Sequence, residues 1–436
     1  MGKEQIVVVG AGVAGLTAAY LLLKKGYGVT VLEREKAVGG LARSYRYDKY
    51  TFDIGPHRFH TDRKDVMDFI KFVLNKDALV ISRMSSVYMF DKYHIWPLRP
   101  RTLIRLPFTV LLRAGIDLFT RPSFKGESFK NYILSKYGKT LYEVFFKQYT
   151  EKFTFISGAN LHYSWASASV DRAVIDKKLK MNSLFDTLKV TLMPKPVNTK
   201  FLYPKHGCDI FAIKLANLIK EEGGHIITNV KNVLVKKNGK KIDSISFNGK
   251  NIKIDKLIWT ASIKTISEQL GLDSPKLNYL DTLIFNVEIN RDLGNPNQWV
   301  YFGDKNIIFN RTSIPKNFSP YLVPKGKDSI CVEVTCRDKE LWDMPAMIMP
   351  RVLKDLIKTK MCKRNDIGKV HVEKVRETYP IYSITYPGQL KKANENLKTF
   401  ANLYCTGRTG AFYYNNMDNS IEMIFDLIKQ FPEVKG

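Results

Sequence analysis

The chain begins with a short apolar run, a glycine-rich turn and a second apolar segment. Residues 6–9 (IVVV) are β-branched and uninterrupted by polar positions, which is typical of a central parallel strand buried on both faces. Residues 16–25 predict a helix, and residues 29–32 predict a second strand that ends at Glu33. This strand–helix–strand order predicts a Rossmann-type unit.

Three glycines, Gly10, Gly12 and Gly15, follow the first predicted strand in the sequence GAGVAG. Gly10 permits a tight turn, Gly12 lets the backbone approach a diphosphate, and Gly15 lets the helix pack closely on the strand. The N-terminus of the helix directs free N–H groups and a positive dipole end at that diphosphate. Glu33 is placed to accept hydrogen bonds from a ribose diol. These residues predict a dinucleotide site.

Hydropathy alone would indicate a signal peptide or a membrane span at residues 6–23. The fixed glycine spacing favours the cofactor unit instead, and no other stretch of 18 residues is predominantly apolar and uncharged. We therefore expect a cytoplasmic protein, soluble or membrane-peripheral.

The chain is strongly basic, with 69 Lys+Arg against 42 Asp+Glu and a formal net charge of +27. Such an excess favours anionic partners, either small substrates or acidic membrane surfaces. No helix-turn-helix, zinc-finger or RNA-binding signature is present, so nucleic acid is not expected. The five cysteines lack paired or histidine-linked spacing, so we expect neither a metal site nor a disulfide framework.

Residues 39–44 (GGLARS) follow the second predicted strand. This segment resembles the GG-x-x-[RS] element of the FAD family that contains amine oxidases, protoporphyrinogen oxidase, phytoene desaturases and UDP-galactopyranose mutase. The resemblance implies non-covalent FAD, with Gly39 and Gly40 admitting the flavin diphosphate and Arg43 bracing it.

Residues 53–61 (DIGPHRFHT) are similar to the histidine loop of UDP-galactopyranose mutases, GPHxFHT. The resemblance implies that His57 and His60 lie against one face of the isoalloxazine. Two histidines three residues apart are also compatible with metal ligation or with a surface position. No third metal ligand is evident from the sequence.

Residues 407–418 (GRTGAFYYNNMD) resemble the mutase pattern GR-x-G-x-x-x-Y-x-D-M-D. A helix predicted at 420–431, beginning near Asp418, would direct its positive end at the flavin and stabilise the anionic reduced form; a helix that only closes the domain is the alternative. The resemblance implies flavin contacts, substrate-diphosphate contacts and catalytic roles for Gly407, Arg408, Tyr414, Asn416, Met417 and Asp418.

Two further segments, residues 141–152 (LYEVFFKQYTEK) and 203–207 (YPKHG), are similar to mutase elements in the expected order. The sequence also departs from the mutases. Phe153 replaces the tryptophan that stacks on uridine, Leu280 stands where a diphosphate-binding arginine is expected, and Asn416 replaces an aspartate. Arg172 loosely matches another phosphate-binding arginine.

The predicted fold class is α/β: a discontinuous Rossmann-type FAD domain (1–95, 200–265 and 390–436) with a mainly helical lobe (96–199) and a strand-rich substrate lobe (266–389). A stretch within the helical lobe, residues 96–124, places five arginines among leucines, phenylalanines and prolines. This stretch could dock on anionic lipid, or it could form part of a lobe that packs over the active site. We favour the second interpretation. These arginines are Arg99, Arg101, Arg105, Arg113 and Arg121.

The resemblance implies an enzyme that acts on an activated sugar, most simply a nucleotide sugar for polysaccharide or glycan synthesis. In that mechanism reduced flavin N5 attacks the anomeric carbon, and NAD(P)H is a candidate reductant. The alternative is an oxidoreductase that takes hydride from a lipophilic substrate, as protoporphyrinogen oxidase and desaturases do. A flavin-bearing structural protein is a third, less favoured class. The sequence leaves the sugar and the oligomeric state open.

Overall fold

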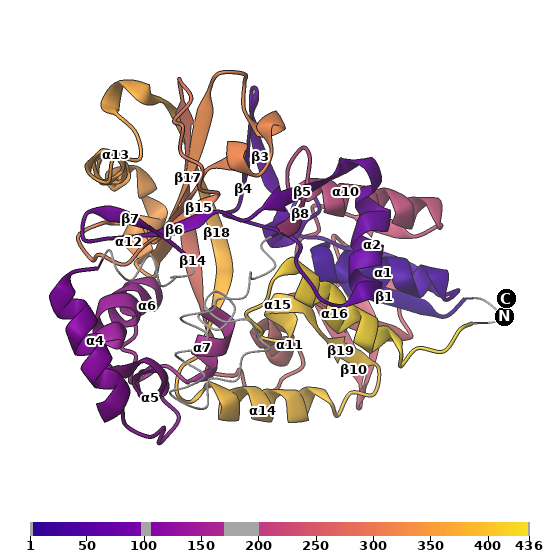
Figure 1. Ribbon diagram of the computed structural model, residues 1–436. Helices are drawn as coiled ribbons and strands as arrows, with labels where there is room; N and C mark the ends of the chain where they lie inside the picture. Colours follow the sequence, from indigo (N-terminus) through magenta and orange to yellow (C-terminus); the bar gives the residue numbers. More distant parts are fainter. Residues whose placement is uncertain (1–2, 97–105, 170–199, 435–436) are drawn as a thin grey trace.

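A computed structural model describes residues 3–96, 106–169 and 200–434. Figure 1 shows two β-rich regions side by side, with a parallel sheet and its helices on the right and a larger antiparallel region on the left. Helices α4–α7 lie below the larger region. Arg172 and residues 97–105, which include Arg99, Arg101 and Arg105, lie outside the described residues.

Five parallel strands form the first sheet, in the order β19-β13-β1-β2-β9. In the central strand, Ile6 and Val8 pack into the core beneath the helices, whereas Val7 and Val9 pack into the core on the opposite face. Burial on both sides explains the absence of polar positions in this strand. The strands are β1 (Gln5–Val9), β2 (Gly28–Leu32), β9 (His225–Ile227), β13 (Lys256–Trp259) and β19 (Leu403–Cys405). The predicted mixed α/β fold with a Rossmann-like domain is confirmed.

Four helices cover one face of this sheet: α1 (Val13–Lys24), α2 (Lys64–Leu74), α10 (Asp209–Glu221) and α16 (Met417–Ile428). Helix α16 begins and ends three residues before the predicted limits of 420 and 431. A three-stranded antiparallel sheet contributes to the core on the other face. Its strands are β10 (Leu234–Asn238), β11 (Lys241–Phe247) and β12 (Lys250–Lys253).

The second large sheet has seven strands in the order β18-β14-β17-β16-β15-β6-β7. They are β6 (Ser85–Met89), β7 (Lys92–Ile95), β14 (Asn278–Ile289), β15 (Trp299–Phe302), β16 (Arg311–Ser313), β17 (Asp328–Cys336) and β18 (Ile367–Ile381). Strands β6 and β7 come from the segment that the sequence prediction assigned to the FAD domain, yet β6 pairs with β15. Two two-stranded antiparallel sheets complete the fold: the hairpin of β3 (Ser44–Tyr47) with β4 (Tyr50–Asp53), and the pairing of β5 (Ala78–Ser82) with the distant β8 (Lys200–Pro204).

The helical lobe contains α4 (Phe108–Thr120), α5 (Phe129–Leu141), a π-helical segment (Tyr142–Lys147), α6 (Gln148–Thr154) and α7 (Ser164–Ser169). The remaining α-helices are α11 (Ile263–Gln269), α12 (Lys339–Asp343), α13 (Met349–Lys358), α14 (Tyr386–Leu397) and α15 (Gly407–Gly410). Across the described ranges, none of the helices combines the length and apolar character needed to span a bilayer.

Candidate cofactor and substrate cleft

The three glycines of the first turn differ in what surrounds them. Gly10 has φ +102°, and a Cβ there would lie 2.3 Å from the Thr260 hydroxyl oxygen. A Cβ on Gly15 would lie 1.9 Å from the Gly10 carbonyl oxygen, so the protein's own packing requires both of these glycines. Gly12 has an ordinary φ of −76°, and a Cβ there would meet only Gly40 Cα, at 3.9 Å. The space in front of Gly12, at the N-terminus of α1, is open to a ligand.

Glu33 ends β2 with a buried side chain that faces this turn. One carboxylate oxygen accepts a hydrogen bond from the Ala11 amide at 2.7 Å, and the other accepts one from the Glu35 amide at 2.9 Å. Each oxygen retains an unused acceptor site. Glu33 therefore holds the glycine turn in place and can still accept from a ribose hydroxyl.

The second glycine pair closes the same end of the cleft. Gly39 and Gly40 have φ +116° and +57°, and the Gly39 amide donates to the Ala11 carbonyl at 2.8 Å. The Arg43 side chain lies 3.4 Å from Glu35, and its Nε is buried with no hydrogen-bond partner among the described residues. Buried donors are normally satisfied, so Arg43 has a donor available for an anionic ligand here.

These residues line one end of a cleft of about 1280 Å³ that runs from the parallel sheet towards the seven-stranded sheet. Pockets for a single drug-sized molecule measure roughly 300–1,000 Å³. The cleft is therefore large enough for an extended dinucleotide and a second ligand. The open cradle at Gly12, the free Arg43 donor and the ribose-facing Glu33 fit FAD.

The histidine loop reaches the middle of the cleft with one of its two histidines. His57 lines the cleft, and its Nδ1 lies 3.2 Å from the Gly55 carbonyl oxygen. Burial, together with the positive charges of Arg408 and Arg311, lowers the pKa of His57 to about 4. His57 is consequently neutral at pH 7. His60 is not among the residues that line the cleft, and its Nδ1 lies 3.2 Å from the Lys200 carbonyl oxygen.

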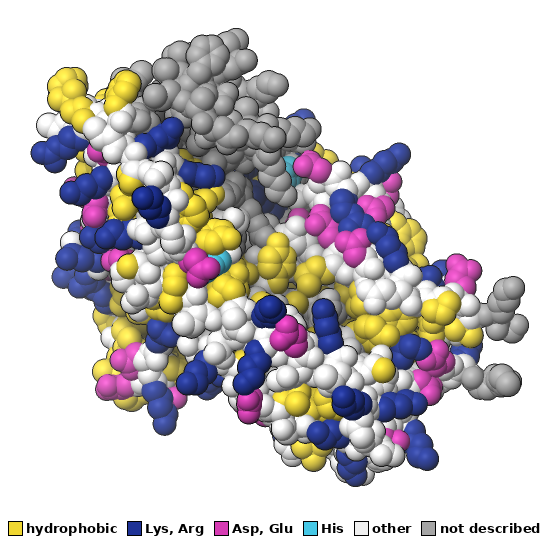
Figure 2. Space-filling view, turned by 90° about the horizontal axis from the view of Figure 1, so that it is seen from below, with side chains coloured by type: hydrophobic (Ala, Val, Ile, Leu, Met, Phe, Trp, Pro, Cys, Tyr) yellow, Lys and Arg dark blue, Asp and Glu magenta, His cyan; other side chains and the backbone are white. Residues whose placement is uncertain are grey.

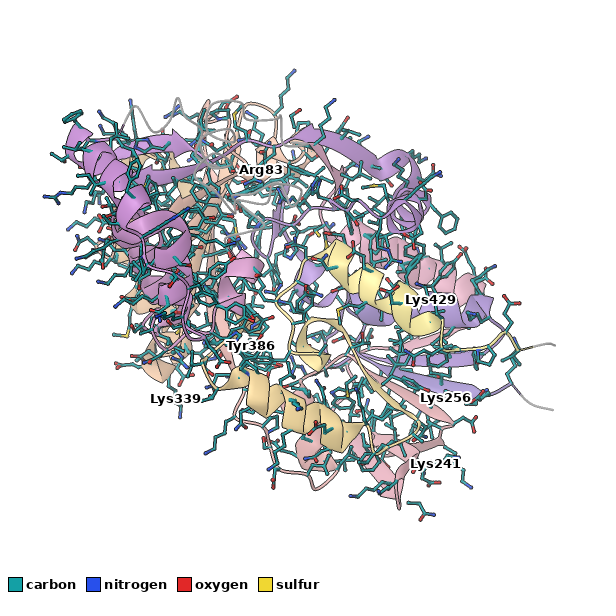
Figure 3. All side chains as sticks on the ribbon, turned by 60° about the horizontal axis from the view of Figure 1, so that its bottom comes forward. Arg83, Lys241, Lys256, Lys339, Tyr386 and Lys429 are labelled. Carbon is teal, nitrogen blue, oxygen red and sulfur yellow. The ribbon has the colours of Figure 1, made fainter. Side chains whose placement is uncertain are left out.

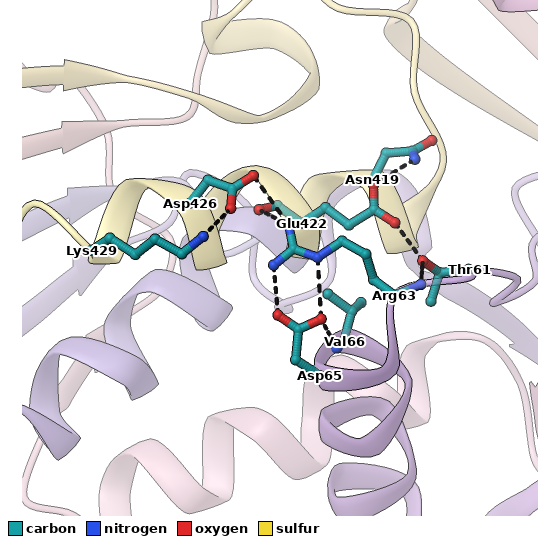
Figure 4. A network of polar contacts seen from close by, with 8 residues as sticks. All are labelled: Thr61, Arg63, Asp65, Val66, Asn419, Glu422, Asp426 and Lys429. Carbon is teal, nitrogen blue, oxygen red and sulfur yellow. Dashed lines mark hydrogen bonds and ion pairs between the residues drawn. The ribbon is translucent and has the colours of Figure 1, made fainter.

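A polar network ties the end of the histidine loop to α16 (Figure 4). Thr61 donates to Glu422. Arg63 forms ion pairs with Asp65 at 2.6 Å and with Asp426 at 3.1 Å. This network fixes the loop that carries His57 to the helix that begins at the cleft.

Arg408 lies in α15 at the cleft, where its guanidinium contacts backbone and two aromatic rings. Nε donates to the Thr378 carbonyl at 2.9 Å, and Nη1 donates to the Asn415 carbonyl. The guanidinium carbon lies 5.1 Å from the Tyr379 ring centre and 4.7 Å from that of Tyr414. Arg408 therefore holds the loop with Tyr414 and Asn415 against β18, in addition to any contact with a ligand.

The rest of the C-terminal motif divides between the cleft and the core. Gly407, Tyr414, Asn416 and Met417 line the cleft, and Asn416 caps α16 through a capping box. Asp418 is buried behind them and is not a lining residue. Its Oδ1 has no partner among the described residues, and burial raises the pKa of this carboxyl to about 7.

Two arginines that the sequence did not single out converge on one tryptophan. The guanidinium carbons of Arg58 and Arg83 lie 5.1 and 5.3 Å from the centre of the Trp299 ring. Arg58 and Trp299 line the cleft, whereas Arg83, labelled in Figure 3, is not among the lining residues. In the described part of the chain, neither arginine forms an ion pair with a carboxylate. No motif signals this group, because its members come from the histidine loop, the β5–β6 connection and β15.

Unlike Arg58 and Arg83, Arg311 has its charge neutralised by a carboxylate. It forms a bidentate ion pair with Glu333, at 2.6 and 2.7 Å, and donates to the Tyr379 hydroxyl at 2.8 Å. An aromatic cluster continues from Tyr379 through Phe153 and Trp165 to Tyr414, with ring centres 4.9 to 6.0 Å apart. Phe153, which replaces the expected tryptophan, is buried within this cluster. Trp165 contacts Tyr414 instead, a position that the motif comparison did not identify.

The fold and the cleft define a protein with a Rossmann-like domain joined to a seven-stranded sheet and a group of helices. The NAD(P)-binding Rossmann-like domain family matches residues 8–73. A 4,4'-diapophytoene desaturase (4,4'-diaponeurosporene-forming) of Staphylococcus haemolyticus is 25% identical over 312 residues, 65% of this chain and 60% of the desaturase. An L-amino-acid oxidase of Crotalus adamanteus is 46% identical over 68 residues, 16% of this chain and 13% of the oxidase. The matched part of the chain thus spans less than two thirds of the length of each of these relatives.

Solved structures resemble the chain over almost its full length. Reduced UDP-galactopyranose mutase superposes with a TM-score of 0.83 at 21% identity, over 98% of this chain and 96% of the mutase. A protein described as a protoporphyrinogen oxidase from Exiguobacterium sp. 255-15 superposes with a TM-score of 0.77 at 15% identity, over 99% of both chains. The chain therefore shares the fold of these two proteins.

Proposed function

We propose that this protein is an enzyme that binds FAD non-covalently and acts on an anionic, activated sugar, most simply a nucleotide sugar. The FAD diphosphate would lie in front of Gly12 and Gly40, braced by Arg43, with the adenosine ribose on Glu33. The flavin ring would extend towards His57 and Arg408. Supporting observations are the open space at Gly12 and the unsatisfied Arg43 donor.

The observation that carries the substrate class is the pair of arginines on Trp299. Burial lowers the pKa of both guanidiniums, and the charge of Arg58 lowers the pKa of Arg83 further, whereas the Asp418 carboxyl acts in the opposite direction on Arg58. Two close cations without an ion-paired carboxylate are costly unless an anion occupies the space between or beside them. A diphosphate supplies that charge, and an arginine fork binds phosphate oxygens in a bidentate manner.

The chain's own residues would position the substrate and stabilise its leaving group. Reduced FAD would supply the nucleophilic nitrogen that attacks the anomeric carbon. Arg58 would neutralise the departing diphosphate, and the nearby charge of Arg83 would add to this effect, which is the kind of electrostatic assistance that contributes most in such displacements. His57, neutral at pH 7, would contact the ring without adding charge. NAD(P)H is a candidate reductant.

A second candidate function is oxidation of a lipophilic substrate. The desaturase match favours it, as do Tyr379 and Tyr414, whose rings line the cleft and would contact an apolar chain. In that reaction oxidised FAD would accept hydride, and Arg58 and Arg83 would have no leaving group to stabilise.

The redox requirement for turnover separates the two functions. Protein reduced with dithionite is mixed with UDP-sugars under anaerobic conditions, and ring-isomer products are measured by chromatography. The proposal predicts isomerisation only after reduction, with a loss of about a hundredfold in Arg58→Gln, which removes the unpaired charge. Lys316→Gln, which breaks an ion pair outside the cleft, serves as the control. No product from any sugar nucleotide, together with bleaching of oxidised flavin by an isoprenoid, would establish the second function.

A further inference from the structure

Helix α4 has an apolar face that is exposed to solvent. Phe108, Leu112, Ile116 and Phe119 are 76, 56, 54 and 79% exposed. At 100° per residue these four positions fall within an arc of about 80° on the helix surface. Large hydrophobic side chains scattered singly on a surface are normal, but a contiguous stripe of four indicates an interaction site.

The opposite face of α4 is the one that holds the helix to the protein. Asp117, which lies about 180° around the helix from Phe108, accepts a hydrogen bond from the Thr140 amide at the end of α5. A Cβ on Gly138 would lie 2.5 Å from the Asp117 Cβ, so the two helices are in close contact there. Folding therefore does not require the exposed stripe.

The lobe that carries this stripe exposes more cations than carboxylates. Arg113 lies on α4 itself, about 60° around the helix from Ile116. Between residues 106 and 169, Arg113, Lys125, Lys130 and Lys139 are exposed, whereas Glu127 is the one exposed carboxylate among these described residues. Figure 2 shows hydrophobic and basic side chains, with some acidic ones, along the left edge of the molecule, the side on which α4 lies in Figure 1. An apolar stripe with a cation at its edge, on a lobe with an excess of exposed cations, is the pattern of a helix that lies in the interface of an anionic bilayer.

We propose that α4 docks this protein onto a membrane surface rich in anionic phospholipid, with the stripe in the acyl boundary, Arg113 at the headgroups and the other exposed cations of the lobe adding to the attraction. Docking by α4 needs no membrane-spanning segment, since an interfacial helix lies parallel to the bilayer. The charge complementarity selects a lipid surface over an uncharged protein partner. The proposal does not depend on which substrate the cleft binds.

The test is cosedimentation of the full chain with vesicles of phosphatidylcholine alone or with about 30% phosphatidylserine, at low and at high salt. We expect binding to the anionic vesicles at low salt, and its loss at high salt, because headgroup attraction is screened. Leu112→Ser should lower the partition coefficient about tenfold, and Phe108→Ser with Phe119→Ser further.

Leu234→Ser is the matched control, because Leu234 lies on β10 and is 55% exposed, almost the same as Leu112. It should bind vesicles as the unmodified chain does. Circular dichroism verifies that each variant is folded. Absence of binding at low salt, or equal binding by the Leu112 and Leu234 variants, would overturn the proposal. Sedimentation velocity tests the alternative that a second copy of the chain packs on the stripe. Self-association that Leu112→Ser abolishes, in a protein that does not bind vesicles, would assign the stripe to a dimer contact and would also overturn the membrane proposal.

Discussion

At the scale of single residues, Arg408 has a larger structural role than its motif implies. All three of its donor nitrogens contact backbone carbonyls of Thr378 or Asn415. Removing the side chain leaves these carbonyls without their partner and releases the loop that carries Tyr414. The sequence analysis assigned Arg408 to flavin and substrate; the structure adds an architectural function.

We therefore expect Arg408→Ala to lower both stability and turnover. The free energy of unfolding should fall by about 3 kcal/mol, since hydrogen bonds from a charged donor are lost. Arg408→Lys should recover little of either property, because a single ammonium cannot reproduce the guanidinium fork. Urea unfolding and product formation, measured on the same preparations, check both effects. An Arg408→Ala variant with unchanged stability and turnover would contradict this assignment.

The residues of the first turn could be predicted from sequence because their constraints are local. The distance between Gly10 and Gly15 is fixed by the strand-to-helix turn itself, so GxGxxG encodes the geometry in six positions. The Trp299 group could not be predicted in this way. Arg83 meets Trp299 because β6 pairs with β15, with Ser85 opposite Trp299, and no local pattern encodes a pairing across more than 200 residues.

At the scale of elements, the beginning of α16 combines a helix N-terminus with a buried carboxyl. The positive end of the helix favours an anion, but burial outweighs it and raises the pKa of Asp418 to about 7. An acid whose pKa is higher in the folded state than in the unfolded state stabilises the fold at low pH. That contribution is complete below about pH 4 and is lost as the pH rises through about 7.

Asp418→Asn should remove this dependence. The free energy of unfolding of the unmodified chain should fall between pH 5 and pH 8 relative to the variant, by about 3 kcal/mol. Asp426→Asn, on the exposed face of the same helix, is the control and should retain the decline. Chemical denaturation at the two pH values measures the difference. A parallel pH dependence in Asp418→Asn and the unmodified chain would show that another group titrates.

Helix α6 carries a lysine that belongs to a segment resembling the mutases and also has a structural role. Lys152, the last residue of the LYEVFFKQYTEK segment, donates to four carbonyls in the β15–β16 region, including those of Phe302 and Phe309 at 2.7 and 2.8 Å. It therefore fastens the helical lobe to the seven-stranded sheet. The sequence indicated that this segment matters; only the tertiary arrangement shows that this lysine acts on the backbone.

At the scale of the whole molecule, the cleft lies where the Rossmann-like domain faces the seven-stranded sheet. The parallel sheet, its helices and the discontinuous order of its strands follow from apolar runs and turn glycines that the sequence displays. The position of β6 and β7 in the seven-stranded sheet could not be predicted, because the residues of a short strand with mixed burial do not indicate which strand it will pair with.

The central claim is that the cleft binds FAD with its diphosphate at Gly12. The measurement is the absorbance spectrum of purified wild-type and Gly12→Val protein before and after heat denaturation, with the released flavin quantified in the supernatant. We predict stoichiometric FAD from the wild type and colourless but folded Gly12→Val, because the valine fills ligand space and meets little of the protein. Wild-type protein that cannot be loaded with FAD, or a Gly12→Val variant that retains stoichiometric FAD, would contradict the account.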